Sequence, residues 1–188
     1  MENKTVKSGT IKNMLDELAA CGVCQTGKRY LKGTPCDLNT LIKVCKGWPE
    51  YLYEHSNYAL PLFRKYLNES DKRILAGQSL YVDYKGQAEV NQSSRVFFMG
   101  DSKADLYTND YAVSTIYLFN KSHVSLYPGN NSILVVEAFD DSNIDVMSGM
   151  NVKVTVYRHD RSKAVGVAKI ISKEYKRGEV FNGREVGE

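Results

Sequence analysis

The sequence predicts an α+β protein, with a small N-terminal helical unit followed by a short parallel β-solenoid. In the first part of the chain apolar residues recur at helical spacing, whereas from about residue 77 they alternate with polar residues. The alternating part repeats every 20 residues, and a fixed period of roughly 20 to 50 residues is typical of stacked repeats. The repeats begin at Ser102, Ser122, Ser142 and Ser162.

The predicted helical unit covers residues 10–76 and follows a polar, flexible N-terminus at 1–9. Its first helix should start near Thr10, because apolar residues then recur three or four positions apart. They are Ile11, Met14, Leu15, Leu18 and Ala19. Gly22 is expected to end this helix, since glycine is common just after a helix.

Two further helices are expected in this unit. Asp37 is a suitable N-cap for the second helix, which Gly47 and Pro49 should close. Apolar residues at 60–67 again follow helical spacing. Because a helix tolerates proline readily only in its first turn, Pro61 places the start of the third helix near residue 60.

The predicted solenoid covers residues 77–168, and each 20-residue rung should contain two strands and two turns. Even-numbered positions are mostly apolar, so their side chains should point inward and the odd-numbered ones outward. Turn-forming residues recur at both bends. They are Gly100-Asp101, Asn120-Lys121, Asp140-Asp141 and Asp160-Arg161 at one bend and Asn109, Gly129 and Gly149 at the other. An antiparallel sandwich also uses short strands, but it does not require this strict register and ranks second.

Residues 169–188 are expected to form a basic cap or tail, because the polar Ser172, Glu174 and Lys176 occupy positions that should point inward. Terminal repeats are often atypical in this way. Basic side chains here are candidates for contact with nucleic acid, although solvated charges are commoner. They are Lys169, Lys173, Lys176 and Arg177.

Charge is unevenly distributed along the chain. The whole chain carries 25 Lys and Arg against 22 Asp and Glu, whereas residues 99–162 hold five basic against eight acidic residues. The repeats are therefore mildly acidic and the two ends are basic. A nucleic-acid platform needs rows of Lys and Arg to neutralise phosphates, so the repeat surface is not expected to be one.

Neither a membrane span nor a secretory signal is expected. No apolar run approaches the roughly 20 residues of a spanning helix, and the N-terminus lacks the apolar core of a signal peptide. We therefore expect the protein in the cytoplasm, where cysteines are usually thiols or metal ligands and not disulfides.

The four cysteines allow three interpretations. Zinc bound by Cys21, Cys24, Cys36 and Cys45 is chemically feasible, since a Cys-x2-Cys pair suits tetrahedral geometry. A second such pair is missing, and Cys45 lies on the apolar stripe of its helix, where a buried thiol is usual. Buried thiols are therefore preferred over zinc and over redox chemistry.

Odd-numbered residues of successive rungs should stack into ladders on the outer surface. The ladders around Val113, Ile133 and Val135 are too apolar to be wholly solvated, and such patches usually mark an interface. Either the helical unit or the tail covers this face, or a protein partner or a second copy binds it. The candidate interface residues are Tyr107, Tyr127, Val113, Ile133, Val135, Tyr117, Tyr157, Phe119 and Phe139.

One outer ladder has the residue types of a glycosidase. Asp105 and Asp145 should lie two rungs apart, roughly 9.6 Å, at the edge of the range for an inverting carboxylate pair. Tyr107 and Tyr127 beside them could hold a sugar ring. Polar outward residues are ordinary in a solenoid, however, so we expect no catalytic residue, cofactor or metal and keep a carbohydrate-binding or carbohydrate-acting role as an alternative.

The repeats resemble those of uncharacterised β-helix proteins found in bacteriophages and bacterial mobile elements. The segments 120–127 (NKSHVSLY) and 140–146 (DDSNIDV) are similar to their Asn-Ser-x-Val-x-Ala-Tyr units. The segments 24–28 (CQTGK) and 45–48 (CKGW) are similar to a small domain that often accompanies those repeats. The chain departs from the pattern at Lys121, which stands between the Asn and the Ser.

The resemblance implies a β-helix fold, an origin in a phage or prophage, and an interaction role without an established activity. We therefore expect a non-catalytic protein-interaction module in the cytoplasm of a bacterial host, such as an accessory protein or an inhibitor of a host defence system. Its outer ladders would bind the partner. The alternative outside the carbohydrate class is a nucleic-acid-associated protein that acts through its basic ends.

Overall fold

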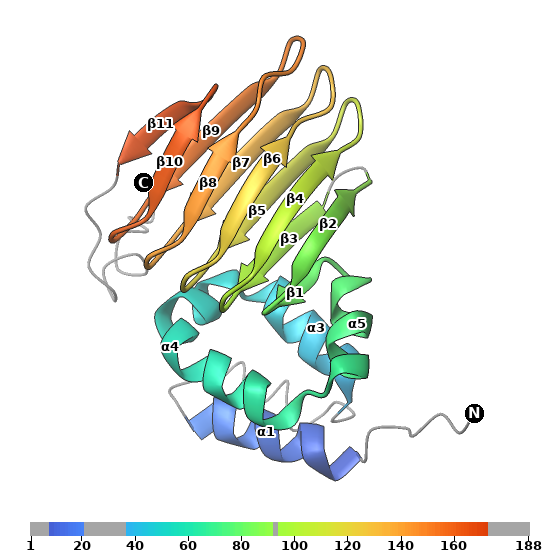
Figure 1. Cartoon of the computed structure of the whole chain (residues 1–188). Coiled ribbons are helices and arrows are strands. Elements are labelled where there is room, and N and C mark those ends of the chain that lie inside the picture. The colour runs from blue at the N-terminus through green and yellow to red at the C-terminus, as the bar shows by residue number, and fades with distance from the viewer. Residues whose placement is uncertain (1–7, 21–36, 92–93, 173–188) are drawn as a thin grey trace, which may run out of the picture. The chain divides into compact units, whose positions relative to one another are not determined.

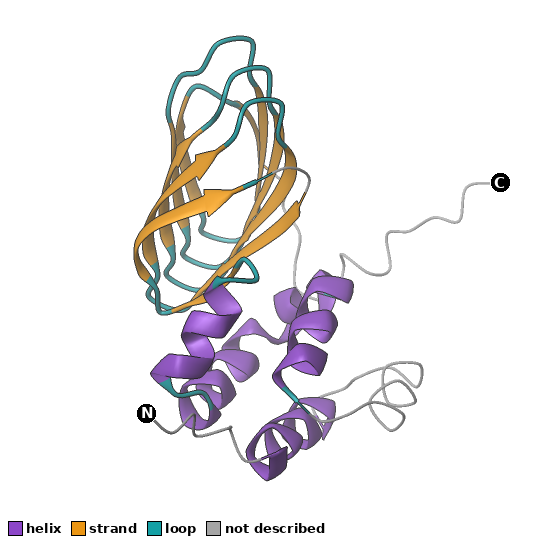
Figure 2. Ribbon diagram, turned by 90° about the vertical axis from the view of Figure 1, so that its right-hand side faces the viewer, coloured by secondary structure: helices purple, strands orange, loops and turns teal. Residues whose placement is uncertain are grey.

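The computed structural model describes residues 8–20, 37–91 and 94–172. The chain divides into two compact units, Met1–Gln78 and Ser79–Glu188. The described part of the first unit contains helices, and that of the second contains strands (Figure 1 and Figure 2). The predicted fold, a helical unit followed by a parallel β-solenoid, is confirmed.

The helices of the first unit enclose an apolar core, in which Met14 and Phe63 are fully buried. The helices are α1 (Ser8–Ala20), α3 (Leu38–Gly47), α4 (Pro49–Tyr66) and α5 (Glu69–Ala76). Asp37 caps α3 as predicted, since its carboxylate accepts a hydrogen bond from the Thr40 amide at 2.8 Å. In the described part of the chain, no helix is long and apolar enough to cross a membrane.

The predicted start of the third helix was wrong. α4 already begins at Pro49, and Pro61 lies in its interior. Proline suits the first position of a helix, where no amide donor is needed, so Pro49 opens α4. The backbone leaves helical angles at His55 (φ −119°, ψ 18°). α4 is therefore kinked at His55, and Pro61 follows this kink by six residues.

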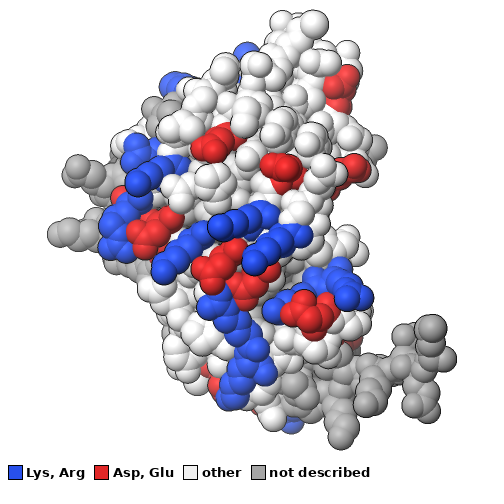
Figure 3. Space-filling view, in the orientation of Figure 1, with Lys and Arg blue, Asp and Glu red and all other residues white. Residues whose placement is uncertain are grey.

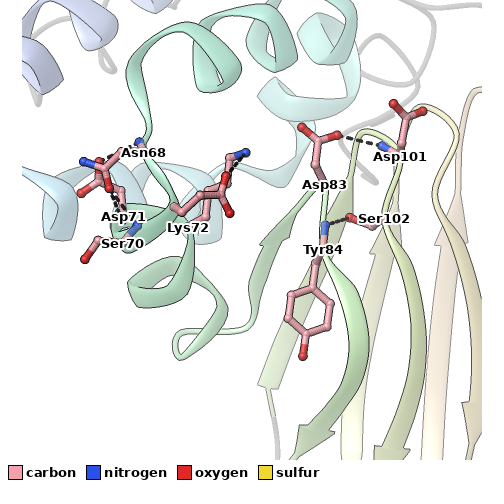
Figure 4. A network of polar contacts seen from close by, with 9 residues as sticks. Asn68, Ser70, Asp71, Lys72, Asp83, Tyr84, Asp101 and Ser102 are labelled. Carbon is pink, nitrogen blue, oxygen red and sulfur yellow. Dashed lines mark hydrogen bonds and ion pairs between the residues drawn. The ribbon is translucent and has the colours of Figure 1, made fainter.

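The helix α5 was not predicted, although its start is encoded locally. Asn68 accepts hydrogen bonds from the amides of Ser70 and Asp71 at 2.8 and 3.0 Å (Figure 4). Asp71 in turn accepts one from the Asn68 amide at 3.0 Å. This capping box satisfies amides that would otherwise lack a partner at the helix start, and the helix then buries Leu75.

The second unit is a solenoid of two parallel sheets, between which the chain alternates. Each 20-residue rung of the solenoid, called a coil from here on, therefore contributes one strand to each sheet. Sheet A contains β1 (Leu80–Val82), β3 (Ser94–Met99), β5 (Val113–Leu118), β7 (Ile133–Ala138), β9 (Lys153–Arg158) and β11 (Lys169–Ser172). Sheet B contains β2 (Lys85–Val90), β4 (Lys103–Thr108), β6 (His123–Tyr127), β8 (Asn143–Val146) and β10 (Lys163–Gly166).

The 20-residue register holds through the central coils. Leu106 of β4 pairs with Leu126 of β6, and Ile116 of β5 pairs with Val136 of β7. These even-numbered side chains are fully buried, as predicted. Because neighbouring strands lie about 4.8 Å apart, each outward side chain lies directly over the equivalent one of the next coil.

The solenoid extends past its predicted end at residue 168. Lys169 of β11 pairs with Thr155 of β9, so the last coil is shorter than the others. The chain turns at Gly166, which has a φ of 102° and where a Cβ would lie 2.0 Å from the Val146 carbonyl oxygen. The other basic residues of the predicted tail lie outside the described residues; they are Lys173, Lys176 and Arg177.

A column of three rings lies inside one corner of the solenoid. The rings of Phe119, Phe139 and His159 stack with centroids 5.3 and 4.4 Å apart, and all three residues are buried. Each precedes a turn residue of positive φ, such as Asn120 (60°) and Asp140 (58°), and this reversal ends the simple alternation of the strand. The prediction that Phe119 and Phe139 contribute to the outer surface was therefore wrong.

Candidate interaction surface

The solenoid has two edges, at which the chain turns from one sheet to the other. We define the charged edge by the turns 100–101, 120–121, 140–141 and 160–161. Six of these eight residues are charged. Arg161 holds the Asp141 carboxylate through two nitrogens at 2.6 and 2.7 Å, and this hydrogen bonding lowers the pKa of Asp141.

The apolar edge lies at the other end of the strands, which is the upper end of the solenoid in Figure 1. We define it by the turns 110–111, 130–131 and 150–151 with the flanking residues Tyr107, Tyr127, Met147, Val113, Ile133 and Lys153. Tyr111 and Met150 are 73% and 68% exposed, and Val113 and Ile133 are 52% and 51% exposed. Only two of these twelve residues are charged, and Figure 3 shows this end mostly white.

The backbone of the apolar edge is bonded between coils. The Tyr111 amide donates to the Asn130 carbonyl at 2.8 Å, and the Asn131 amide donates to the Met150 carbonyl at 2.9 Å. Asp110 accepts a hydrogen bond from the Asn130 amide at 2.6 Å. The turns therefore support one another, and their outward side chains are held on a firm frame.

Tyr111 adopts a backbone conformation that is unfavourable for its residue type. Its φ is 62°, and the equivalent residues of the next two turns, Asn131 and Asn151, have φ of 57° and 54°. Asparagine accepts this left-handed region readily, whereas a bulky residue there costs roughly 1–2 kcal/mol. Because the Tyr111 side chain is largely exposed, burial within the chain does not offset that cost. Strained residues of this kind cluster at functional sites.

The flank of the apolar edge on sheet B is a continuous ladder. Tyr107 and Tyr127 stack with ring centroids 4.7 Å apart and ring planes 13° apart. The ladder continues at Met147 and Val167, whose amides donate to carbonyls of the preceding coil at 2.9 and 3.0 Å. Tyr107, Met147 and Val167 are exposed. This flank therefore extends the apolar surface along the solenoid axis.

The other predicted interface residues lie on the outer face of sheet A and are exposed to different degrees. Val135, Tyr117 and Tyr157 are half-buried. The Tyr117 ring stacks on Phe97 at a centroid distance of 4.9 Å. Of the residues predicted on this face, Val113 and Ile133 are thus the ones most available to a partner.

Two of the most exposed side chains, Tyr111 and Met150, were not predicted. Both lie in turns, and alternation assigns outward positions only within strands. The register nevertheless contains a signal, because the position of Tyr111 is occupied by asparagine in the next two coils. A large side chain at a turn position of a repeat is the feature that could have revealed this part of the edge.

The two carboxylates considered for sugar chemistry lie on sheet B in the predicted register. Asp105 pairs with Ser125, and Ser125 pairs with Asp145. The Asp145 carboxylate lies 3.1 Å from Nε2 of His123. The tyrosine rings beside them stack on each other, so each ring covers one face of its neighbour, a face on which a sugar could otherwise rest.

Of the four cysteines, only Cys45 lies in the described part of the chain. It is buried in α3, and burial raises the pKa of its thiol to about 12, so the thiol stays protonated at neutral pH. Cys21, Cys24 and Cys36 lie outside the described residues. Within residues 8–20, 37–91 and 94–172, no group of three or more His, Cys, Asp and Glu is placed to hold a metal ion.

Comparison of the chain with protein-family models, curated proteins and solved structures gives no match. The evidence for function therefore comes from the surface of the solenoid. On that surface, the apolar edge combines high exposure, low charge and a strained tyrosine.

Proposed function

We propose that the chain is a non-catalytic protein-interaction module that binds a partner through its apolar edge. The observation that carries this proposal is the cluster of exposed apolar side chains at one edge, with Tyr111 and Met150 in its turns. Contiguous exposed apolar patches usually mark interaction sites. Tyrosine and methionine are also enriched at the centres of protein interfaces.

The construction of the edge supports a protein partner over a polyanion. One acidic and one basic residue leave the edge without net charge, whereas nucleic-acid binding relies on neutralising phosphates. The turns are already held by hydrogen bonds between coils. Little conformational entropy is therefore lost when a partner docks on them.

Two other roles have weaker support. Of the four basic residues expected to contact nucleic acid, only Lys169 lies in the described part of the chain, so that role stays a prediction from sequence. A carbohydrate-binding role has less support, because Tyr107 and Tyr127 cover one ring face of each other. Binding of a protein is the role that most observations favour.

The resemblance of the repeats to phage β-helix proteins supports a more specific form of the proposal. An accessory protein of a phage or prophage would meet its partner in the cytoplasm of a bacterial host. Inhibition of a host defence protein is one such role, because a firm apolar edge can mask a partner's surface without any chemistry.

Affinity capture from a bacterial lysate with quantitative mass spectrometry tests the proposal. The variant Tyr111→Asn/Met150→Asn introduces at each position the residue of the equivalent middle turn, so it removes apolar side chains and keeps the turn chemistry. The matched control, Val165→Asn, changes a residue that is 57% exposed elsewhere on sheet B.

We expect a partner captured by the wild type and the control to be recovered at least about tenfold less with the double variant. Circular dichroism of the three baits should be the same. Equal recovery with all three baits would contradict binding through the apolar edge.

A further inference from the structure

We infer that the apolar edge binds the same edge of a second copy of this chain, with the two solenoids antiparallel. This inference rests on the proposed function, because it takes the edge to be an interaction surface and names one occupant. Its evidence is the distribution of charge and apolar side chains from one turn to the next.

The two charges of the edge lie at its opposite ends. Asp110 lies in the first turn, Lys153 lies two residues after the third, and the middle turn, 130–131, is uncharged. A two-fold axis beside the middle turn, perpendicular to the solenoid axis, brings the first turn of one copy against the third turn of the other. Asp110 then faces Met150 of the second copy, with Lys153 of that copy at the same end of the edge, and symmetry repeats this arrangement at the other end.

The same symmetry pairs the apolar side chains. Ile133, beside the middle turn, meets Ile133 of the second copy, and Tyr111 faces Asn151 of the second copy, next to Met150. Contact between a methionine sulfur and an aromatic ring is favourable. Dimerisation would therefore bury the exposed tyrosine and give its strained backbone a function.

A parallel pairing of the two edges is opposed by the same charges. With the axis along the solenoid, the two Asp110 residues would lie at one end of the paired edges and the two Lys153 residues at the other. Like charges gathered at each end disfavour this orientation. The charges of the edge therefore favour the antiparallel orientation.

End-to-end stacking of solenoids is a weaker alternative for self-association. The last strands, β10 and β11, begin with Lys163 and Lys169, and lysine on an edge strand opposes pairing with another chain. Arg158 follows Ala138 in an inward column of sheet A. The last coil therefore does not present a purely apolar core to a second copy.

The pairing should be weak because the edge is short. Three turns stacked about 4.8 Å apart form a smaller contact than a standard interface, which buries about 800 Å² on each partner. We therefore expect a dissociation constant on the order of 10–100 µM.

Sedimentation velocity of the full chain, from about 5 to about 500 µM, tests the pairing. The wild type should shift from monomer to dimer across this range. Ile133→Asp places two carboxylates at the centre of the interface and should stay monomeric. The matched control, Val165→Asp, adds the same charge at a similarly exposed valine and should dimerise like the wild type. A wild type that is monomeric at the highest concentration overturns the inference.

A charge exchange tests the orientation. Lys153→Glu places a carboxylate at the same end of the paired edges as Asp110 of the second copy and should weaken dimerisation at least about tenfold. Adding Asp110→Lys should restore dimerisation, whereas purely structural damage from the two substitutions would accumulate. A double variant that dimerises no better than Lys153→Glu overturns the antiparallel arrangement.

A further variant guards against damage to the turn. Asp110 accepts a hydrogen bond from the Asn130 amide, and Asp110→Asn keeps an acceptor there while it removes the charge. It should weaken dimerisation by a smaller factor than Lys153→Glu. Unchanged dimerisation of Asp110→Asn would argue against a charge contact at this end of the edge.

The two proposals fail in different ways. If the chain stays monomeric but its edge variants lose a captured partner, self-pairing is overturned and the proposed function stands. If the dimer forms and the edge variants capture the same proteins as the wild type, self-pairing stands and the separate partner is overturned.

Discussion

The two edges of the solenoid meet the same folding requirement with different residues. At the charged edge, the left-handed turn positions are occupied by Gly100, Asn120, Asp140 and Asp160, all of residue types that accept this conformation. Their side chains also join the coils, since Asn120 and Asp140 accept hydrogen bonds from the amides of Gly100 and Asn120 at 3.1 and 2.8 Å. The turn residues of this edge therefore serve the stacking of coils.

At the apolar edge, only some of the left-handed turn positions are occupied by residue types that accept this conformation. Asn131 and Asn151 occupy the left-handed position and are joined by a side-chain hydrogen bond of 3.3 Å, but Tyr111 occupies it in the first turn. Stacking of the coils gives no reason for a tyrosine there. A departure from the repeat, where the usual residue would be more stable, thus indicates a role beyond folding.

The largest effect is expected from a substitution that disrupts the backbone beside a turn of the apolar edge. A Cβ at Gly129 would lie 2.3 Å from the carbonyl carbon of Asn109, and this atom belongs to the backbone of the neighbouring coil. Gly129→Ala should therefore lower the free energy of unfolding by about 3 kcal/mol or more, measured by urea denaturation.

Two other glycines provide graded controls for this substitution. At Gly149 a Cβ would lie 2.6 Å from a Val152 methyl and 2.9 Å from the Pro128 carbonyl oxygen, so Gly149→Ala should cost less. At Gly47, in α3, nothing lies within 4 Å of the added atom, and the change should stay within about 0.5 kcal/mol. If Gly129→Ala and Gly47→Ala lower the free energy of unfolding equally, the contact of the added Cβ with the Asn109 backbone is not the cause.

The next prediction compares the stability cost of replacing two serines that follow turns of the charged edge and occupy equivalent positions in the repeat. The Ser102 hydroxyl donates to the Met99 carbonyl at 2.7 Å, and it accepts from the Tyr84 amide at 3.0 Å (Figure 4). Ser102→Ala should cost about 1–3 kcal/mol, because it leaves both groups without this partner. The Ser142 hydroxyl is buried with no hydrogen-bond partner among the described residues, so Ser142→Ala should be neutral or stabilising. Equal melting temperatures for the two variants would contradict this difference.

The parts of the fold that repeat could be predicted from the sequence. The 20-residue spacing placed Val113 beside Ile133, as the pairing of β5 with β7 confirms, and both side chains are exposed. Alternation failed at the strand ends, where Phe119 and Phe139 turn inward. Both residues lie just past the ends of β5 and β7, where the strand alternation stops, and a pattern of apolar and polar residues does not mark where it stops.

Other features depend on contacts that are distant in sequence. α4 has Pro61 in its interior and a kink at His55, and neither follows from the local apolar spacing. In the short last coil, Gly166 lies so close to the Val146 backbone that a Cβ would lie 2.0 Å from its carbonyl oxygen. The capping box of Asn68 and Asp71 was readable but opens a helix of only eight residues. A repeat register therefore predicts stacking well and predicts ends and corners poorly.

A smaller effect is expected from exchanging tyrosine and asparagine at the left-handed turn position of the apolar edge. Tyr111→Asn should raise the free energy of unfolding by about 1 kcal/mol, because asparagine relieves the strain. The same variant should weaken dimerisation, so denaturation and sedimentation are measured on one preparation. The reverse change, Asn131→Tyr, should destabilise the next turn by a similar amount. A Tyr111→Asn variant that is less stable than the wild type would contradict the strain argument.

The smallest effect concerns the exposed ion pair of the charged edge. Hydrogen bonding to Arg161 lowers the pKa of Asp141 in the folded chain. A lowered folded-state pKa contributes stability above the unfolded pKa, and this contribution is lost as the pH falls through the folded pKa. Arg161→Gln should therefore lower the thermal midpoint slightly at pH 7 and not at all in strong acid.

Exposure to solvent keeps the effect of Arg161→Gln on the thermal midpoint small. The Arg161 side chain is 80% exposed, so the pair is screened, and measured surface pairs contribute little. A greater loss for Arg161→Gln in acid than at pH 7 would refute the argument. If the loss is small, the charged edge owes its stability to turn residues, hydroxyls and stacked rings. The two exposed charges of the apolar edge would then likewise select the orientation of a partner more than they strengthen its binding.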